Sequence, residues 1–185
     1  MITDPCPHNV SVFPNSGTSS SSRITPALIR ELRGRFSLDW NGIHGVRHWA
    51  RVRYTGLLLA AETGADAAVV EYFAFLHDAL RLNDDHDPWH GMRSAELAED
   101  LGPGLVRLNA RQLQLLRTAC SFHSEGYTEA DITVMTCWDA DRLDLGRVGI
   151  EPSPRYLCTP QARQSDFIAA AYRRSIAPLA VGGAE

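Results

Sequence analysis

The sequence predicts an all-α protein. The chain has 185 residues, which is enough for one domain with a real hydrophobic core and too few for two ordinary domains. Helix start and stop signals divide most of the chain into segments of helical length, and no stretch shows the sustained two-residue alternation of a strand. We therefore expect one helical bundle without a sheet.

The N-terminal part contains several prolines and the serine run Ser19 to Ser22. Such a stretch can bury little apolar surface, so residues 1–23 are expected to form a disordered leader. Thr25 followed by Pro26 is typical of a helix start and predicts a helix to about Phe36. Residues 37–45 contain two glycines and predict a loop.

The next two predicted helices form the middle of the domain. One begins near His48 and ends at Gly64, a natural C-cap. Asp66 can cap the following helix, which is apolar nearly all round up to His77 and Asp78. That pattern predicts the buried centre of the fold.

The remaining helices are expected at about 90–101, 106–124, 129–144 and 160–176, separated by glycine- and proline-containing segments. The folded domain then spans residues 24–178, and residues 179–185 form a flexible tail.

Composition narrows the possible partners. The formal net charge is -4 and the chain contains no Lys, so no basic surface favours a nucleic-acid polymer or a membrane. The four cysteines form no C-x-x-C pair, which gives no support to a zinc ribbon or a disulfide scaffold. With no signal-peptide pattern either, we expect a cytoplasmic protein, with homo-oligomers possible.

Several simple catalytic motifs are absent. His44 and His48 are four residues apart, as in the zincin helix, but Gly45 stands where that motif requires a glutamate. The chain has no glycine-rich phosphate loop and no G-x-S-x-G elbow. The histidines and aspartates must therefore be considered as a set drawn from several helices.

The order of these residues resembles the H…HD…D signature of the HD superfamily of metal-dependent phosphohydrolases. The matching pieces are an H-x-x-R-V segment at His48, an apolar run into His77-Asp78, and the block D-A-D-R-L-D that begins at Asp139. The resemblance covers roughly residues 25–175. It implies an HD-domain helical bundle with a metal site in its centre.

By this resemblance, the metal ligands are His48, His77, Asp78 and Asp139. Asp141 and Asp144 are alternatives to Asp139, although both can instead pair with Arg142 or Arg147. Two consecutive residues on a helix point about 100° apart, so His77 and Asp78 can share a metal only at the edge or end of their helix.

Two further histidines, His90 and His123, lie between the HD pair and the last aspartate, as in binuclear members of the superfamily. They are either ligands of a second metal, with Asp78 bridging the two ions, or substrate contacts beside a single ion. The resemblance thus implies one or two divalent ions, with Mn²⁺, Mg²⁺, Fe and Ni²⁺ all compatible with the ligand types.

The expected function is metal-dependent hydrolysis of a phosphomonoester or nucleotide by a metal-activated water. Asp78 would orient the water, His44 and His90 would assist charge or proton transfer, and Arg51 and Arg81 would contact the substrate phosphate. The alternatives are a non-catalytic HD module that senses a nucleotide or metal, and a di-iron oxygenase on the same fold.

Overall fold

The computed structural model describes residues 22–177. In this range it contains eight α-helices, two short 3-10 helices and no strand, which confirms the all-α prediction for this part of the chain. Most of the expected leader and the whole expected tail lie outside the described residues. At the start of the described range, Ser22 and Arg23 already contact the buried Glu71.

The first three helices begin where the sequence predicts. Helix α1 (Pro26–Arg35) starts behind Thr25, whose hydroxyl accepts a hydrogen bond from the Leu28 amide. Helix α2 (Val46–Thr63) ends at Gly64, which adopts a left-handed conformation with φ of 76°. The Asp66 side chain caps α3 (Ala67–Leu76).

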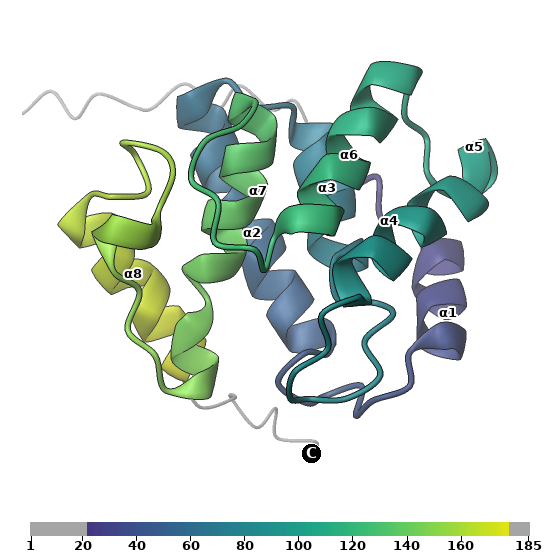
Figure 1. Cartoon of the computed structure of the whole chain (residues 1–185), viewed down its shortest axis with the longest axis horizontal. Helices are drawn as coiled ribbons and strands as arrows, with labels where there is room; N and C mark the ends of the chain where they lie inside the picture. Colours follow the sequence, from purple (N-terminus) through teal and green to yellow (C-terminus); the bar gives the residue numbers. More distant parts are fainter. Residues whose placement is uncertain (1–21, 178–185) are drawn as a thin grey trace, which may run out of the picture.

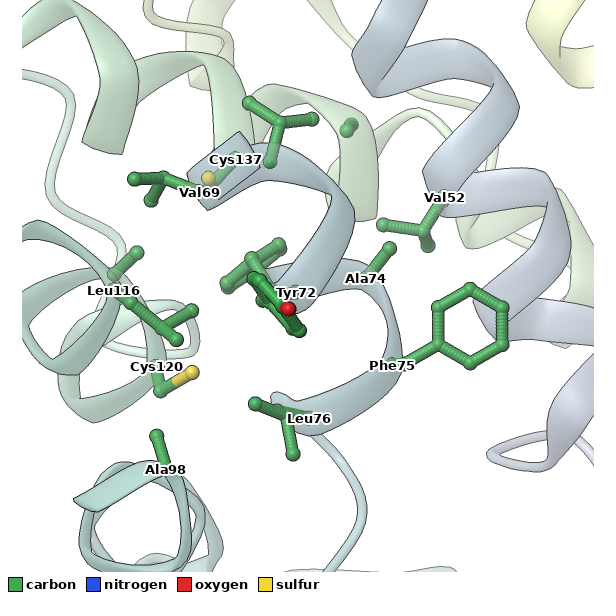
Figure 2. Packing of buried hydrophobic residues seen from close by; sticks show 14 of the residues in the cluster. Val52, Val69, Tyr72, Ala74, Phe75, Leu76, Ala98, Leu116, Cys120 and Cys137 are labelled. Atoms are coloured by element: carbon green, nitrogen blue, oxygen red, sulfur yellow. The ribbon is translucent and has the colours of Figure 1, made fainter. Parts of the chain in front are cut away.

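Helix α3 is the centre of the bundle. All of its residues from Ala68 to Leu76 are buried, as the continuous apolar sequence predicts. It packs against α2, α6 (Ala110–Phe122), α7 (Ile132–Arg142) and α4 (His90–Asp100). Figure 2 shows side chains from these helices converging on α3, among them Val52 of α2, Leu116 of α6 and Cys137 of α7.

The C-terminal part differs from the expectation. Helix α8 (Ser165–Ile176) begins five residues later than predicted, because residues 157–164 form a turn held to α7 through Asp139. Two short 3-10 helices, η1 (Leu145–Val148) and η2 (Pro154–Tyr156), occupy the segment before it, and a short α5 (Gly102–Leu105) follows α4. Figure 1 shows α8 and this segment at one side of the molecule, and α1, α4 and α5 at the other.

Within residues 22–177, no helix combines the length and the apolar character needed to cross a membrane.

Candidate metal centre

The candidate site residues lie at the ends of helices that meet around the C-terminus of α3. His77 is the C-cap of α3 and Asp78 follows it in a turn, so the helix presents its end to the site. His90 is the first residue of α4, and His123 is the C-cap of α6. His48 lies in the first turn of α2. The structure therefore brings together histidines that the sequence separates by up to 75 residues.

His48 and His77 form the first pair. Their Nε2 atoms are 3.0 Å apart, and both side chains are completely buried. The other ring nitrogen of each is already engaged: Nδ1 of His48 donates to Asp144 at 2.7 Å, and Nδ1 of His77 donates to the Phe73 carbonyl at 3.1 Å. In the neutral rings, this leaves an unprotonated Nε2 on both histidines, directed at the same point.

His90 and His123 form a second pair of the same kind. Their Nε2 atoms are 2.8 Å apart. Nδ1 of His90 donates to the Asp87 carbonyl, and Nδ1 of His123 donates to the Cys120 carbonyl at 2.7 Å. A hydrogen bond at Nδ1 that fixes the ring and leaves Nε2 as a lone-pair donor is the usual arrangement of metal-binding histidines.

Asp78 lies between the two pairs. Its Oδ2 is 3.8 Å from Nε2 of His48 and 3.7 Å from Nε2 of His77. Its Oδ1 is 3.3 Å from Nε2 of His90 and 3.5 Å from Nε2 of His123. One carboxylate thus faces both pairs, with one oxygen on each side.

The structure places Asp141, and not Asp139, in this cluster. Oδ1 of Asp141 is 3.3 Å from Nε2 of His48 and 3.7 Å from Nε2 of His77. The Asp139 carboxylate instead accepts hydrogen bonds from the amides of Cys158 and Thr159 at 2.6 and 2.8 Å, and from the Thr159 hydroxyl. Asp139 therefore holds the turn before α8, and its expected position among the ligands has to be corrected.

His44 lies beside the cluster, in the turn that precedes α2. Its Nδ1 donates to Oδ2 of Asp78 at 2.7 Å. The turn depends on Gly45, where an added Cβ would lie 2.2 Å from the Trp40 carbonyl oxygen, so only glycine allows this close approach. His44 is thereby fixed at the open side of Asp78.

Burial and neighbouring charges shift the pKa values of the site residues in different directions. Burial lowers the pKa of His77 to about 3, and burial together with the neighbouring His123 lowers the pKa of His90 to about 4. Burial also disfavours charge on His123, but Asp78 outweighs it and raises the pKa of that ring. Burial likewise opposes ionisation of Asp78 and Asp141, yet the histidines around them keep both carboxyl pKa values below the usual range.

The donor set could hold a metal ion. Three groups of three residues each offer ligand atoms that lie within 4.8 Å of one another; they are His48, His77 and Asp78, then His77, His123 and Asp141, and then Asp78, His90 and His123. Two nitrogen ligands about 2.1 Å from one ion and at a right angle are about 3 Å apart, close to both Nε2 separations. Oδ1 of Asp78 is buried without a hydrogen-bond partner. A buried carboxylate oxygen that lacks a hydrogen bond and faces two imidazole nitrogens is an environment that a cation stabilises.

A cavity of about 390 Å³ opens onto the cluster. Its inner wall includes His44, Asp78 and Asp141, and its outer wall comes mainly from residues 145–157. Arg81, predicted as a phosphate contact, lines this cavity. Arg51 does not line it, because its guanidinium is paired with Asp144 at 2.6 and 2.9 Å behind His48.

Arg142 and Arg147 also line the cavity, and neither was expected as a substrate contact. Arg147 is close to the carboxylates of Asp141 and Asp144, at 4.0 and 3.9 Å. Arg142 has no carboxylate within that distance among the described residues; its Nη1 donates to the Tyr156 carbonyl at 2.8 Å, and its Nη2 has no hydrogen-bond partner. In the sequence, Arg142 lies near two aspartates, which predicts an ion pair. The sequence therefore gives no sign that Arg142 lacks a carboxylate partner.

Comparison of the chain with protein-family models, with curated proteins and with solved structures gives no match. What can be said of its function therefore rests on the residues and on the geometry of the cluster.

Proposed function

We propose that this chain is a metal-dependent phosphohydrolase of the HD type, with a site for two divalent ions. The observation that carries the proposal is the convergence of four imidazole Nε2 atoms, each with its Nδ1 fixed by another acceptor, on the Asp78 carboxylate. One ion would be held by His48, His77 and Asp141, and the other by His90 and His123, with Asp78 shared. The two-sided contacts of Asp78 favour this arrangement over a single ion.

When bound, the ions would supply Lewis-acid polarisation of a phosphoryl oxygen and an acidified water molecule for the attack on phosphorus. The chain's own contribution starts with orientation. Asp78 stays ionised, so its carboxylate can accept a hydrogen bond from the attacking water. The same carboxylate accepts a hydrogen bond from His44 and so fixes the orientation of that ring.

His44 is the group best placed to move a proton. Its Nδ1–H is donated to Asp78, so only the imidazolium form of the ring carries a proton on Nε2; that form would pass the Nε2 proton to the departing alkoxide and become the neutral ring. Arg81 and Arg142 lie on the same cavity and add positive charge where a phosphoryl group gains negative charge. His90, expected to assist catalysis, is proposed as an ion ligand.

The direct test is hydrolysis of a panel of phosphomonoesters and nucleotides by protein loaded with Mn²⁺, Fe²⁺, Ni²⁺ or Mg²⁺. We expect turnover with at least one metal, its loss on chelation, and a decrease of about 10²-fold or more in kcat for His44→Gln with the metal retained. The exposed His86→Gln is the matched control and should keep full activity.

Failure of every metal-loaded sample to hydrolyse any member of the panel would contradict the proposal. If instead the iron-loaded protein develops an optical band on exposure to air and turns over no phosphoester, the chain is better explained as a di-iron oxygenase on this fold.

A further inference from the structure

The cavity beside the metal cluster has two chemically different parts. One part carries arginine side chains next to Asp78 and Asp141. The other is formed by residues 145–157, where most of the lining side chains are apolar: Leu145, Ile150, Pro152, Tyr156 and Leu157. Ile150 and Tyr156 are 53% and 58% exposed, so they lie at the open side of the wall.

The charge balance of the cavity suits one phosphoryl group. Of its three arginines, Arg147 lies near Asp141 and Asp144, and Arg81 lies 3.5 Å from Oδ1 of Asp78. Arg142 is the one without a carboxylate partner among residues 22–177, although its side chain is almost completely buried. Its Nη1 donates to the Tyr156 carbonyl and to Cys158 Sγ, and the guanidinium lies over the Trp138 ring. Its Nη2 has no hydrogen-bond partner in the same range, and an anion at Nη2 would stabilise this buried charge.

We propose that the cavity binds a phosphomonoester whose organic group is apolar and preferably planar. Arg142 and Arg81 contact the single phosphoryl group, and the wall of Ile150, Pro152 and Tyr156 covers the organic group. The proposal deepens the function above and rests on it. Glu151 on the same wall adds a negative charge to the cavity, which disfavours ligands with further phosphate groups.

The volume and the lining agree with such a ligand. A cavity of about 390 Å³ lies in the lower part of the range found for small-molecule sites, roughly 300–1,000 Å³. A few charged groups at one end fix the orientation, and an apolar wall provides most of the contact area. An aromatic organic group can stack on the Tyr156 ring.

The experiment is calorimetric titration of metal-loaded protein with two phosphonates that cannot be hydrolysed, phenylphosphonate and methylphosphonate. We expect phenylphosphonate to bind at least roughly tenfold more tightly, because only its ring reaches the apolar wall. Tyr156→Ser should remove most of that preference. Tyr54→Ser is the matched control: Tyr54 is also exposed and lies beneath Arg174, as Tyr156 lies beneath Arg155, but Tyr54 is outside the cavity.

Arg142→Met should weaken both phosphonates by a similar factor, about tenfold, and so leave their ratio unchanged. Thermal unfolding shows whether each variant folds. If Arg142→Met does not fold, the comparison of wild type with Tyr156→Ser tests the inference by itself. Equal affinity of wild type for the two phosphonates, or a preference that survives Tyr156→Ser together with Ile150→Ser, would overturn the inference.

The outcomes separate this inference from the proposed function. If phenylphosphonate is preferred but no phosphoester is hydrolysed, the ligand class stands and the enzyme proposal fails. If hydrolysis occurs without any preference for the aromatic probe, the enzyme proposal stands and the ligand class is wrong.

Discussion

Asp139 and Asp141 lie two residues apart on α7 but have unrelated surroundings. Positions i and i+2 of a helix are about 200° apart around its axis, so the two carboxylates face opposite sides. Asp141 and Asp144 are three positions apart and share a side, and both contact His48, at 3.3 Å through Nε2 and 2.7 Å through Nδ1. Asp144 thus orients the His48 ring, and Asp141 would bind the same metal ion as that ring.

This difference predicts opposite effects of two matched variants. Asp141→Asn should remove a metal ligand and lower metal affinity by about 10-fold or more. Asp139→Asn should keep the metal and lower the free energy of unfolding by about 1–3 kcal/mol, because an amide NH₂ group would face the donors of Cys158 and Thr159. Metal titration and urea unfolding measure the two quantities.

If Asp139→Asn loses metal affinity and Asp141→Asn keeps the affinity of wild type, the metal ligand is Asp139 and not Asp141.

The sequence is sufficient to choose the histidines of the candidate site, but not to choose which aspartate of the D-A-D-R-L-D block lies beside them. The D-A-D-R-L-D block offers three carboxylates, and choosing among them requires knowing which side of α7 faces α2. A single sequence does not contain that rotation. The same limit applies to Arg51, which pairs with Asp144 instead of reaching the cavity.

At the scale of elements, the packing of α4 against α6 sets the distance between His90 and His123. Gly91 allows this packing, because an added Cβ would lie 2.4 Å from the Cys120 carbonyl oxygen. Cys120 is also the residue whose carbonyl fixes the His123 ring. The helix contact and the second histidine pair therefore depend on the same short stretch of backbone.

Gly91→Ala should separate the two helices and lower the free energy of unfolding by about 1–3 kcal/mol. It should also lower the affinity for the metal ion proposed at His90 and His123. Gly34→Ala is the matched control: Gly34 is also helical, and an added Cβ there meets nothing within 4 Å. It should stabilise the protein by about 0.5–1 kcal/mol. Urea unfolding with metal analysis checks both variants, and a Gly91→Ala protein as stable as wild type would show that α4 and α6 are not so closely held.

The elements that the sequence predicts well are those with local signals at their ends. Thr25, Asp66 and Gly64 each stop or start a helix by a contact or conformation within a few residues. The start of α8 has no such local signal. Residues 157–164 are held as a turn by Asp139, about 20 positions earlier in the chain, and only the tertiary structure shows that contact.

For the whole molecule, the cluster makes stability depend on pH when metal is removed. His77 has a pKa of about 3 in the folded chain because it is buried, against about 6.5 when unfolded. Between these values the unfolded chain binds a proton that the folded chain does not, so stability is present above about pH 6.5 and is lost as pH falls. The lowered pKa of His90 acts in the same direction, while the raised pKa of His123 acts in the opposite direction, so the two lowered histidines together outweigh one raised histidine.

Chelator-treated protein should therefore have a lower Tm at pH 5 than at pH 7, with His77 alone contributing about 2 kcal/mol of the loss. His77→Gln should reduce this difference, and the exposed His86→Gln should leave it unchanged. Circular dichroism melts at constant ionic strength measure it. A Tm that is equal or higher at pH 5 would mean that these rings are not buried in the neutral form.

The candidate metal ligands lie at helix ends that meet at the C-terminus of α3. A bundle of this kind cannot place the ligands unless α2, α4, α6 and α7 all pack on α3 as Figures 1 and 2 show. Metal bound there should in turn connect these helices and stabilise the folded chain by mass action. Metal binding and folding are then coupled properties of the whole domain.

The most direct test is the number of Mn²⁺ ions per chain, measured by plasma mass spectrometry after loading and desalting. Two ions should be found in wild type, about one in His123→Gln, and none in Asp78→Ala, the residue shared by both pairs. Absence of metal from wild type after loading with manganese, iron and nickel, or a content that Asp78→Ala leaves unchanged, would contradict a metal centre at this cluster.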